Sequence, residues 1–422
     1  MKLRIENFFF NKIPFCLTFL LPAFLVSGPF LADSAITICA IIFLINSYKN
    51  NLSFYYKNYF FYFFIFFYIY LNLSSLFSSN IIFSLKTSLP YIRFLIFALS
   101  TWHILNNNSK KLIKYLVYCF CIVFLFLEID GLYQYINLHN LFGYPLLSSR
   151  VSSLFGDELI LGSFVSRNFP LFLGLFFLHS ANYNLSKTTK IIFYIVIIFI
   201  PFLVFLSGER SSFFYILLSG IYIFIFLCNK KIFAMYLISF SLIVSGIFLL
   251  DKRFSSRILD TTIAQLTYGQ TSGGKKLNLF SKTHEEHYLS AIRIFKDNVI
   301  LGAGPKSFRL KCSEEKYLIC KDSCITHPHN TYVQLLSETG LVGFFSIFFL
   351  FILISLSSVK MIYHKYFLKK NIEIFKVLLF SSFLITLWPI IPSGNFFNNW
   401  LNIVYYLPLG FFLWVNYKKK NV

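Results

Sequence analysis

The sequence from residue 190 to residue 210 reads Lys190-Ile-Ile-Phe-Tyr-Ile-Val-Ile-Ile-Phe-Ile-Pro-Phe-Leu-Val-Phe-Leu-Ser207-Gly-Glu-Arg210. The stretch between Lys190 and Ser207 carries no charged residue. A helix needs about 20 mostly apolar residues to cross the hydrocarbon core of a bilayer. This run therefore predicts a membrane-spanning helix over residues 190–207, with charged groups at its two ends.

The composition extends this prediction to the whole chain. Of its 422 residues, 57% are hydrophobic and 21% aromatic, and only 13% are charged. Soluble globular domains carry about 25% charged residues. The composition excludes an ordinary cytosolic enzyme, a disordered protein and a disulfide-rich secreted module, and it indicates a polytopic helical membrane protein.

Apolar runs predict an all-α polytopic membrane protein with about twelve transmembrane helices. We expect spans one to nine within residues 1–250, one large external loop over 251–339, and spans ten to twelve with a cytoplasmic tail over 340–422. The predicted spans are 13–32, 34–48, 59–77, 88–105, 112–128, 159–179, 190–207, 211–228, 232–250, 340–359, 373–392 and 399–416.

The distribution of basic residues predicts the orientation. Lys and Arg number 38 against 17 Asp and Glu, which gives a formal charge of +21. In a membrane protein such an excess marks cytoplasmic loops, so we expect no nucleic-acid partner. With the N-terminus inside, the short outer loops hold only Lys86, Arg150 and Arg210. We therefore expect both termini to be cytoplasmic and residues 251–339 to lie outside.

Arg210 stands in a tight turn between two apolar spans. A charge in such a place is costly unless it faces a polar cavity or a partner. Arg210 is therefore either a site residue or a structural residue that pairs with Glu209 or Glu158 or extends to the headgroups. Arg93 and Arg167 also lie near or within spans, and for these two we favour a structural role.

The long loop carries two pairs of histidines, His284 with His287 and His327 with His329. A helix is expected to begin near Thr331, because Pro328 disfavours a helix before it. The positive end of that helix would favour the neutral form of His329, which can accept a proton. His329 is therefore a candidate general base, and the alternative is that it merely caps the helix.

The external cysteines Cys312, Cys320 and Cys324, together with the histidines, raise the question of a zinc site. Their spacing matches no zinc finger or zinc protease pattern, and we expect no metal. An oxidising compartment favours one disulfide among the three cysteines. The sequence does not say which pair forms it.

The segment that follows His329 resembles a known family. His329-Asn330, then nine residues, then Gly340-Leu-Val-Gly343, is similar to the His-Asn-x9-Gly-x-x-Gly signature of the O-antigen ligase and O-antigen polymerase superfamily of bacterial inner membranes. Twelve spans with one large periplasmic loop before span ten is also that family's topology. Further segments that resemble family elements are 150–162, 207–211, 292–309 and 393–400.

The resemblance implies a GT-C-like fold and an inverting glycosyltransferase that uses no metal and no cofactor. Its donor would be a glycan on undecaprenyl pyrophosphate, and the site would lie on the periplasmic side of the inner membrane, in contact with membrane lipids. A ligase would use lipid A-core as the acceptor, whereas a polymerase would use a lipid-linked repeat unit.

The resemblance also implies roles for individual residues. His329 would be the catalytic base, and Arg210 would bind the pyrophosphate. A second family arginine is expected where this chain has His284, so His284 is a candidate for the second phosphate contact, and Arg293, Arg309 and His287 are the alternatives. The remaining expected substrate-binding residues are Arg150, Glu158, His287, His327 and Asn330.

Two alternatives to the ligase stay open. A polymerase that joins lipid-linked repeats would share every motif. A transporter or flippase of lipid-linked sugars belongs to a different class. Transporters place charges or broken helices at mid-membrane in repeated halves, whereas the polar residues here gather in the predicted outer segments.

Overall fold

A computed structural model describes residues 8–226, 241, 244–246, 249, 251–252, 256, 260–267, 280–320 and 323–417. Within these ranges the chain is helical and has no β-strand; two isolated bridges join His139 to Pro145 and Leu147 to Arg150. The predicted all-α fold is therefore confirmed. The predicted ninth span, 232–250, lies almost wholly outside the described residues.

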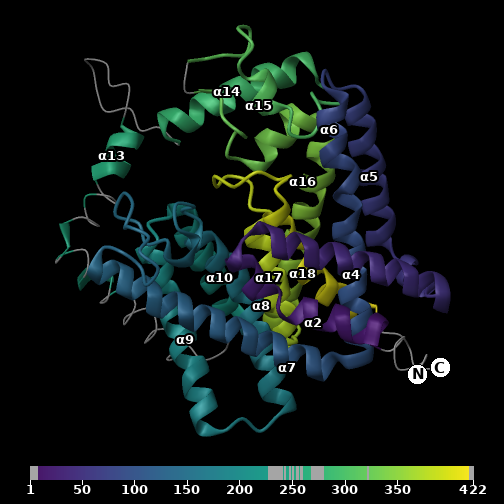
Figure 1. Ribbon diagram of the computed structural model, residues 1–422, viewed down its shortest axis with the longest axis vertical. Helices are drawn as coiled ribbons and strands as arrows, with labels where there is room; N and C mark the ends of the chain where they lie inside the picture. The colour runs from purple at the N-terminus through teal and green to yellow at the C-terminus, as the bar shows by residue number, and fades with distance from the viewer. Residues whose placement is uncertain are drawn as a thin grey trace.

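Figure 1 shows the arrangement of the helices. In chain order the elements are η1 (Phe8–Lys12), α2 (Ile13–Phe19), α3 (Leu21–Ser27), α4 (Pro29–Asn50), η2 (Ser53–Tyr56), α5 (Tyr59–Leu76), α6 (Ile81–Ser88), η3 (Leu89–Tyr91), α7 (Ile92–Asn137), η4 (Ser153–Phe155), α8 (Leu161–Asn182), α9 (Lys187–Leu206), α10 (Arg210–Phe226), α13 (Thr261–Leu266), α14 (Lys282–Asp297), α15 (Phe308–Lys311), α16 (Thr331–Tyr366), α17 (Ile374–Thr386) and α18 (Asn399–Asn416).

Several of these helices are long and apolar enough to cross a membrane, as a multi-pass protein requires. Within the described residues there are six such segments, and a seventh if the bent pair Phe8–Phe19 and Leu21–Ser27 forms one span. The expected number of twelve is not reproduced, partly because α10 and α17 are shorter apolar helices. The six are Pro29–Asn50, Tyr59–Leu76, Ile81–Asn137, Leu161–Asn182, Lys187–Leu206 and Thr331–Tyr366.

The boundaries of the first predicted span were wrong. This span, 13–32, is divided into α2 and α3 with a bend of 55°, and α4 already begins at Pro29. A proline stands in the first turn of each of these three helices, a position that proline favours. The spans predicted at 88–105 and 112–128 lie in α7 on either side of a kink at Asn108 (φ −144°, ψ 40°), where two helices meet.

Aromatic side chains from neighbouring helices fill the core between α7 and α8. Phe120 and Phe124 of α7 and Phe164 and Phe172 of α8 are fully buried. The ring of Phe124 lies 5.9 Å from that of Phe164 and 5.2 Å from that of Phe172, within the range of favourable aromatic pairs. The helix α7 also packs along α18, and α8 along α17.

Three glycines fit the turn 302–304 to α16. Gly302 and Gly304 have positive φ angles of 71° and 101°, and α16 is broken at Gly340, where φ is 62°. A Cβ atom at Gly302 would collide with the peptide between Glu338 and Thr339, and one at Gly340 would collide with the carbonyl of Ile300. Glycine is therefore required on both sides of this contact.

Backbone hydrogen bonds complete the contact at the break in α16. The amides of Ala303 and Gly304 donate to the carbonyls of Ser337 and Glu338 at 2.9 and 2.8 Å. The amide of Leu341 donates to the carbonyl of Val299 at 2.9 Å. This contact holds α14 and α15 at the same end of the molecule as α6 and the start of α16 (Figure 1).

Candidate functional site

A polar cavity of about 940 Å³ collects most of the predicted site residues. Its walls come from segments that are far apart in the sequence, namely 150–167, 208–215, 262–329 and 390–401. The first three lie in or next to the three polar segments expected outside the membrane. A second cavity of about 190 Å³ between α5, α16, α17 and α18 has an apolar lining with no charged residue, so the chemistry belongs to the polar cavity.

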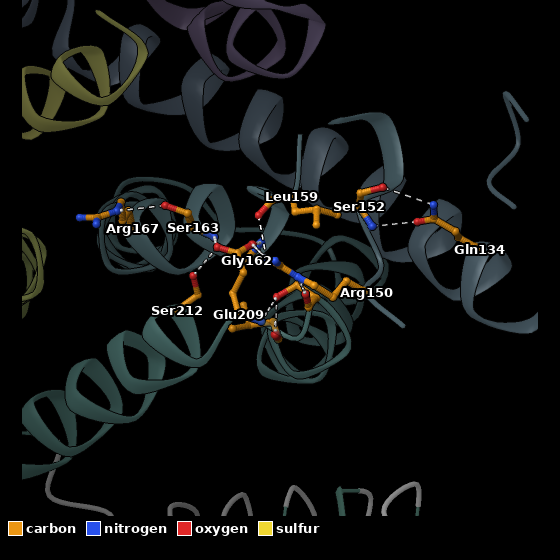
Figure 2. A network of polar contacts seen from close by, with 11 residues as sticks. Gln134, Arg150, Ser152, Leu159, Gly162, Ser163, Arg167, Glu209 and Ser212 are labelled. Carbon is orange, nitrogen blue, oxygen red and sulfur yellow. Dashed lines mark hydrogen bonds and ion pairs between the residues drawn. The ribbon is translucent and has the colours of Figure 1, made fainter. Parts of the chain in front are cut away.

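Glu209 organises one wall of the cavity (Figure 2). Its carboxylate accepts hydrogen bonds from the amides of Gly162 (2.7 Å) and Ser163 (3.2 Å) and from the hydroxyl of Ser212 (3.0 Å). It also lies 3.9 Å from Nη2 of Arg150. Burial raises the pKa of Glu209 to about 7, although Arg150 and the hydrogen bonds lower it.

Arg150 is held firmly in the same network. Its Nε donates to the carbonyl of Ser207 at 3.1 Å, and its Nη2 donates to the carbonyl of Leu159 at 2.9 Å. The loop that carries Arg150 is itself fixed by Gln134, which hydrogen bonds to Ser152 (Figure 2). Arg150 therefore ties the turn after α9 to the segment before α8, and both line the cavity.

Arg210 lines the cavity from the first position of α10. The sequence left open an ion pair with Glu209, but Glu209 takes Arg150 as its partner. Arg210 instead donates to Thr262 Oγ1 at 3.0 Å and to Gln265 Oε1 at 2.5 Å, both in α13.

The histidines of the long loop converge at the opposite wall. The ring centroid of His329 lies 4.3 Å from that of His327, 5.6 Å from that of His284 and 5.9 Å from that of His287. His284, His327 and His329 line the cavity. Within the described residues, no group of three or more His, Cys, Asp or Glu side chains is arranged to hold a metal ion.

The three cavity histidines are neutral near pH 7. Burial and, second to it, the nearby His329 lower the pKa of His284 to about 4 and that of His327 to about 3. Burial and His287 lower the pKa of His329. Nε2 of His327 is buried and has no hydrogen-bond partner among the described residues. A neutral imidazole with a free nitrogen can accept a proton.

The backbone holds His329 in an unusual conformation. Its φ angle is 54°, in the left-handed region that few non-glycine residues adopt and that is common at functional sites. The carbonyl of His329 accepts a hydrogen bond from the amide of Ser393 at 2.8 Å. The helix α16 begins two residues later, as predicted, but its cap is Asn330.

Two predicted substrate-binding residues lie behind the cavity wall. Asn330 uses Oδ1 to accept from the amides of Tyr332 and Val333, and its Nδ2 donates to the carbonyl of Pro389. The imidazole Nδ1 of His287 lies 3.1 Å from the carbonyl of Ser323. Neither residue is among those that line the cavity, so this geometry gives both a positioning role.

The candidates for the second phosphate contact differ in position. Arg293 donates to the carbonyl of Leu318 at 3.1 Å and does not line the cavity. His284 lines the cavity but is neutral, so it cannot supply a positive charge. Arg309 lines the cavity, and its buried Nε has no hydrogen-bond partner among the described residues. Arg309 is thus the candidate that the geometry favours.

Other residues of the cavity were not predicted as site residues. The segment 393–400 resembled a family element, but nothing in its own residue types indicated contact with a substrate. Arg167 was visible as a charge within an apolar span, and we favoured a structural role for it. The structure places both in the cavity lining, together with Glu158, which was predicted.

A disulfide supports the loop that carries the histidines. Cys312 is bonded to Cys324, with 5.0 Å between their Cα atoms, and Cys320 is free. The closed loop ends three residues before His327. The sequence had left this pairing open.

Comparisons with known proteins support the resemblance found in the sequence. Residues 194–348 match the family model described as O-antigen ligase. The matched segment contains Arg210, the long loop with the histidines, and the glycines of α16. No curated protein matches the chain. The family match confirms the predicted resemblance and supports a role in glycan processing at a membrane.

Proposed function

We propose, on the basis of the O-antigen ligase family match over residues 194–348, that this chain is a membrane glycosyltransferase of lipid-linked glycans. It transfers a glycan from undecaprenyl pyrophosphate to a hydroxyl of lipid A-core at the periplasmic face of the bacterial inner membrane. The observation that carries the proposal is one cavity that joins the neutral His329 to Arg210 and Arg309. A base and a set of cations at one site are what such a transfer needs.

The reaction is a displacement at the anomeric carbon of the donor sugar. A nitrogen of His329 takes the proton of the acceptor hydroxyl while that oxygen forms the new glycosidic bond. The bond to the pyrophosphate oxygen breaks at the same carbon, and its electrons stay on the leaving group. Attack from the opposite face inverts the anomeric centre, and His329 later returns its proton to water.

The arginines stabilise the leaving group. Negative charge on the pyrophosphate grows as the bond breaks, and an arginine can clamp phosphate oxygens through two parallel hydrogen bonds. Donors that are fixed before the reaction stabilise such charge best. Arg210, held by α13, and Arg309, with its unpartnered Nε, fit this requirement.

The membrane arrangement is part of the proposal. Both termini are cytoplasmic, residues 251–339 are periplasmic, and the cavity opens to the periplasm. No cofactor or metal takes part. The donor and acceptor are both membrane-anchored, which is consistent with a cavity formed at the end of apolar helices.

A transfer assay with the purified protein in lipid tests the proposal. The protein receives a glycan on undecaprenyl pyrophosphate, with and without lipid A-core, and the products are separated by size. Product that needs lipid A-core supports the ligase. A ladder of longer lipid-linked chains without core would instead identify a polymerase with the same residues in the same roles. The absence of both products with the native glycan would contradict the transferase and favour a transporter of lipid-linked sugars.

A further inference from the structure

The side chain of Arg167 is fixed at the inner end of the cavity. Arg167 stands six residues into α8, about 9 Å along the helix axis from Leu161, and is only 3% exposed. Its Nε donates to Ser163 Oγ at 3.2 Å and its Nη2 to the hydroxyl of Tyr215 at 3.3 Å. The guanidinium lies 4.6 Å from the ring centroid of Tyr215 and 5.6 Å from that of Tyr405.

These contacts position the guanidinium without neutralising its charge. Among the described residues Arg167 forms no ion pair, and its buried Nη1 has no hydrogen-bond partner. Glu209 is the carboxylate whose charge acts on it, yet Glu209 is already occupied by Arg150 and its hydrogen-bond donors. Figure 2 shows Arg167 at one end of this network, linked to it only through Ser163.

A buried charge at the depth of a membrane helix is costly unless it is paired or faces a polar site. Arg167 lines the polar cavity. Ser163 and Tyr215 fix the orientation of the guanidinium and leave one of its N–H donors unused. A guanidinium held in this way is suited to bind an anion. Two more buried nitrogens without partners among the described residues, Nε of Arg309 and Nε2 of His327, belong to residues that line the same cavity.

We propose that Arg167 binds one phosphate of a lipid pyrophosphate and so gives the cavity its preference for a pyrophosphate over a monophosphate. The proposal rests on the proposed function, because it assumes that the donor is a lipid pyrophosphate. A pyrophosphate has one more phosphate group to be held than a monophosphate. Arg210 and Arg309 contact one phosphate, and Arg167 contacts the second phosphate, which a monophosphate lacks.

Binding of three lipids to the full-length protein in phosphatidylcholine nanodiscs tests this assignment. The lipids are undecaprenyl pyrophosphate, undecaprenyl monophosphate and phosphatidylglycerol, which carries the phosphate of an ordinary membrane lipid. The variants are Arg167→Gln and, as a matched control, Arg93→Gln. Arg93 is also a partly buried arginine next to an aromatic ring, but it pairs with Asp33 at 2.7 Å and does not line the cavity.

We expect the wild-type protein and Arg93→Gln to bind the pyrophosphate more tightly than the other two lipids. In Arg167→Gln the affinity for the pyrophosphate should fall about tenfold, equal to about 1.4 kcal/mol, while binding of the monophosphate changes little. If Arg167 only supported the fold, Arg167→Gln would weaken the binding of both polyprenyl lipids alike. An unchanged preference in Arg167→Gln, or phosphatidylglycerol binding as tight as that of the pyrophosphate, would overturn the proposal.

Two further results separate the possible causes of failure. If the wild-type protein binds no undecaprenyl pyrophosphate, the proposed function itself fails. If Arg167→Gln does not fold, Tyr215→Phe replaces it, because this variant keeps the ring over the guanidinium and removes one hydrogen bond. Tyr215→Phe should show a smaller loss of the same preference, and an unchanged preference there overturns the role of Arg167.

Discussion

His329 combines a strained backbone and a lowered pKa with a place in the lining of the polar cavity. We expect His329→Gln to lower kcat by about 10²- to 10⁴-fold, the usual contribution of a positioned base, with little change in donor binding. The measurement is single-turnover transfer together with donor titration. His139→Gln, which changes an exposed histidine outside the cavity, should behave like the wild type; equal rates in both variants would remove His329 from the mechanism.

The protonation state of His329 sets the expected pH dependence. Its pKa is lowered from the ordinary value of 6.5 by burial and by His287. The neutral base is therefore present above the lowered pKa and is lost only as the pH falls through it. We expect the acid limb of kcat/KM for the donor to have its midpoint below pH 6.5, and a midpoint above that value would contradict the neutral base.

Arg210 and Arg93 offer a comparison between two arginines at the first residues of helices, α10 and α7. Arg210→Ala removes a cavity cation, so we expect a loss of about tenfold or more in kcat/KM for the donor, since hydrogen bonds to charged groups contribute about 1.5–3 kcal/mol. Arg93→Ala removes an ion pair with Asp33 away from the cavity and should cost mainly thermal stability. Equal losses of activity in the two variants would deny Arg210 a special role.

Single site residues could be predicted from the sequence where the residue type itself was unusual for its place. Arg210 and His329 could be singled out because a charge and an imidazole beside apolar spans need a reason. The sequence did not show that Arg309 lines the cavity whereas Asn330 and Arg293 do not. Which side chain faces the cavity depends on the packing of the loop against α16, and this packing has no periodic pattern in the sequence.

At the scale of elements, we expect the contact between the 302–304 turn and the break in α16 to contribute to the stability of the protein. Gly302→Ala places a Cβ against the Glu338–Thr339 peptide at a positive φ. We expect a loss of about 1–3 kcal/mol of stability, seen as a lower Tm of the protein in detergent, with a parallel loss of transfer. Gly220→Ala is the matched control, because Gly220 lies within α10 with no atom within 4 Å of an added Cβ. A Tm of Gly302→Ala equal to that of the control would show that the turn accommodates the added Cβ without a loss of stability.

Helix positions were predicted better than helix ends. The positions of α5, α9 and α18 were predicted from long apolar runs, and the predicted bounds of α18 agree with the structure. The break between the spans 88–105 and 112–128 was predicted from the polar residues Asn106 to Lys111, and the kink in α7 lies among them at Asn108. The sequence did not show that the backbone stays helical on both sides of this single residue.

At the scale of the whole molecule, the cavity lies at one end of the helices. Leu161 begins α8 next to the cavity wall, and Asn182 ends the same helix about 30 Å away. The turn after Asn182 therefore lies on the opposite side of a membrane that α8 crosses. Which side faces the periplasm is predicted from the distribution of basic residues, through the positive-inside rule.

Accessibility labelling tests that orientation. Cys320 is free and half-buried in the external loop, and Asn184 is exposed in the turn between α8 and α9. We expect a membrane-impermeant maleimide added to intact spheroplasts to label Cys320. It should not label a cysteine introduced as Asn184→Cys in a Cys320→Ser background until the membrane is opened. The Cys320→Ser variant alone is the control for the remaining free cysteines. The reverse pattern would place the cavity on the cytoplasmic side, where no lipid-linked glycan awaits transfer to an external acceptor, and the proposed reaction would then be excluded.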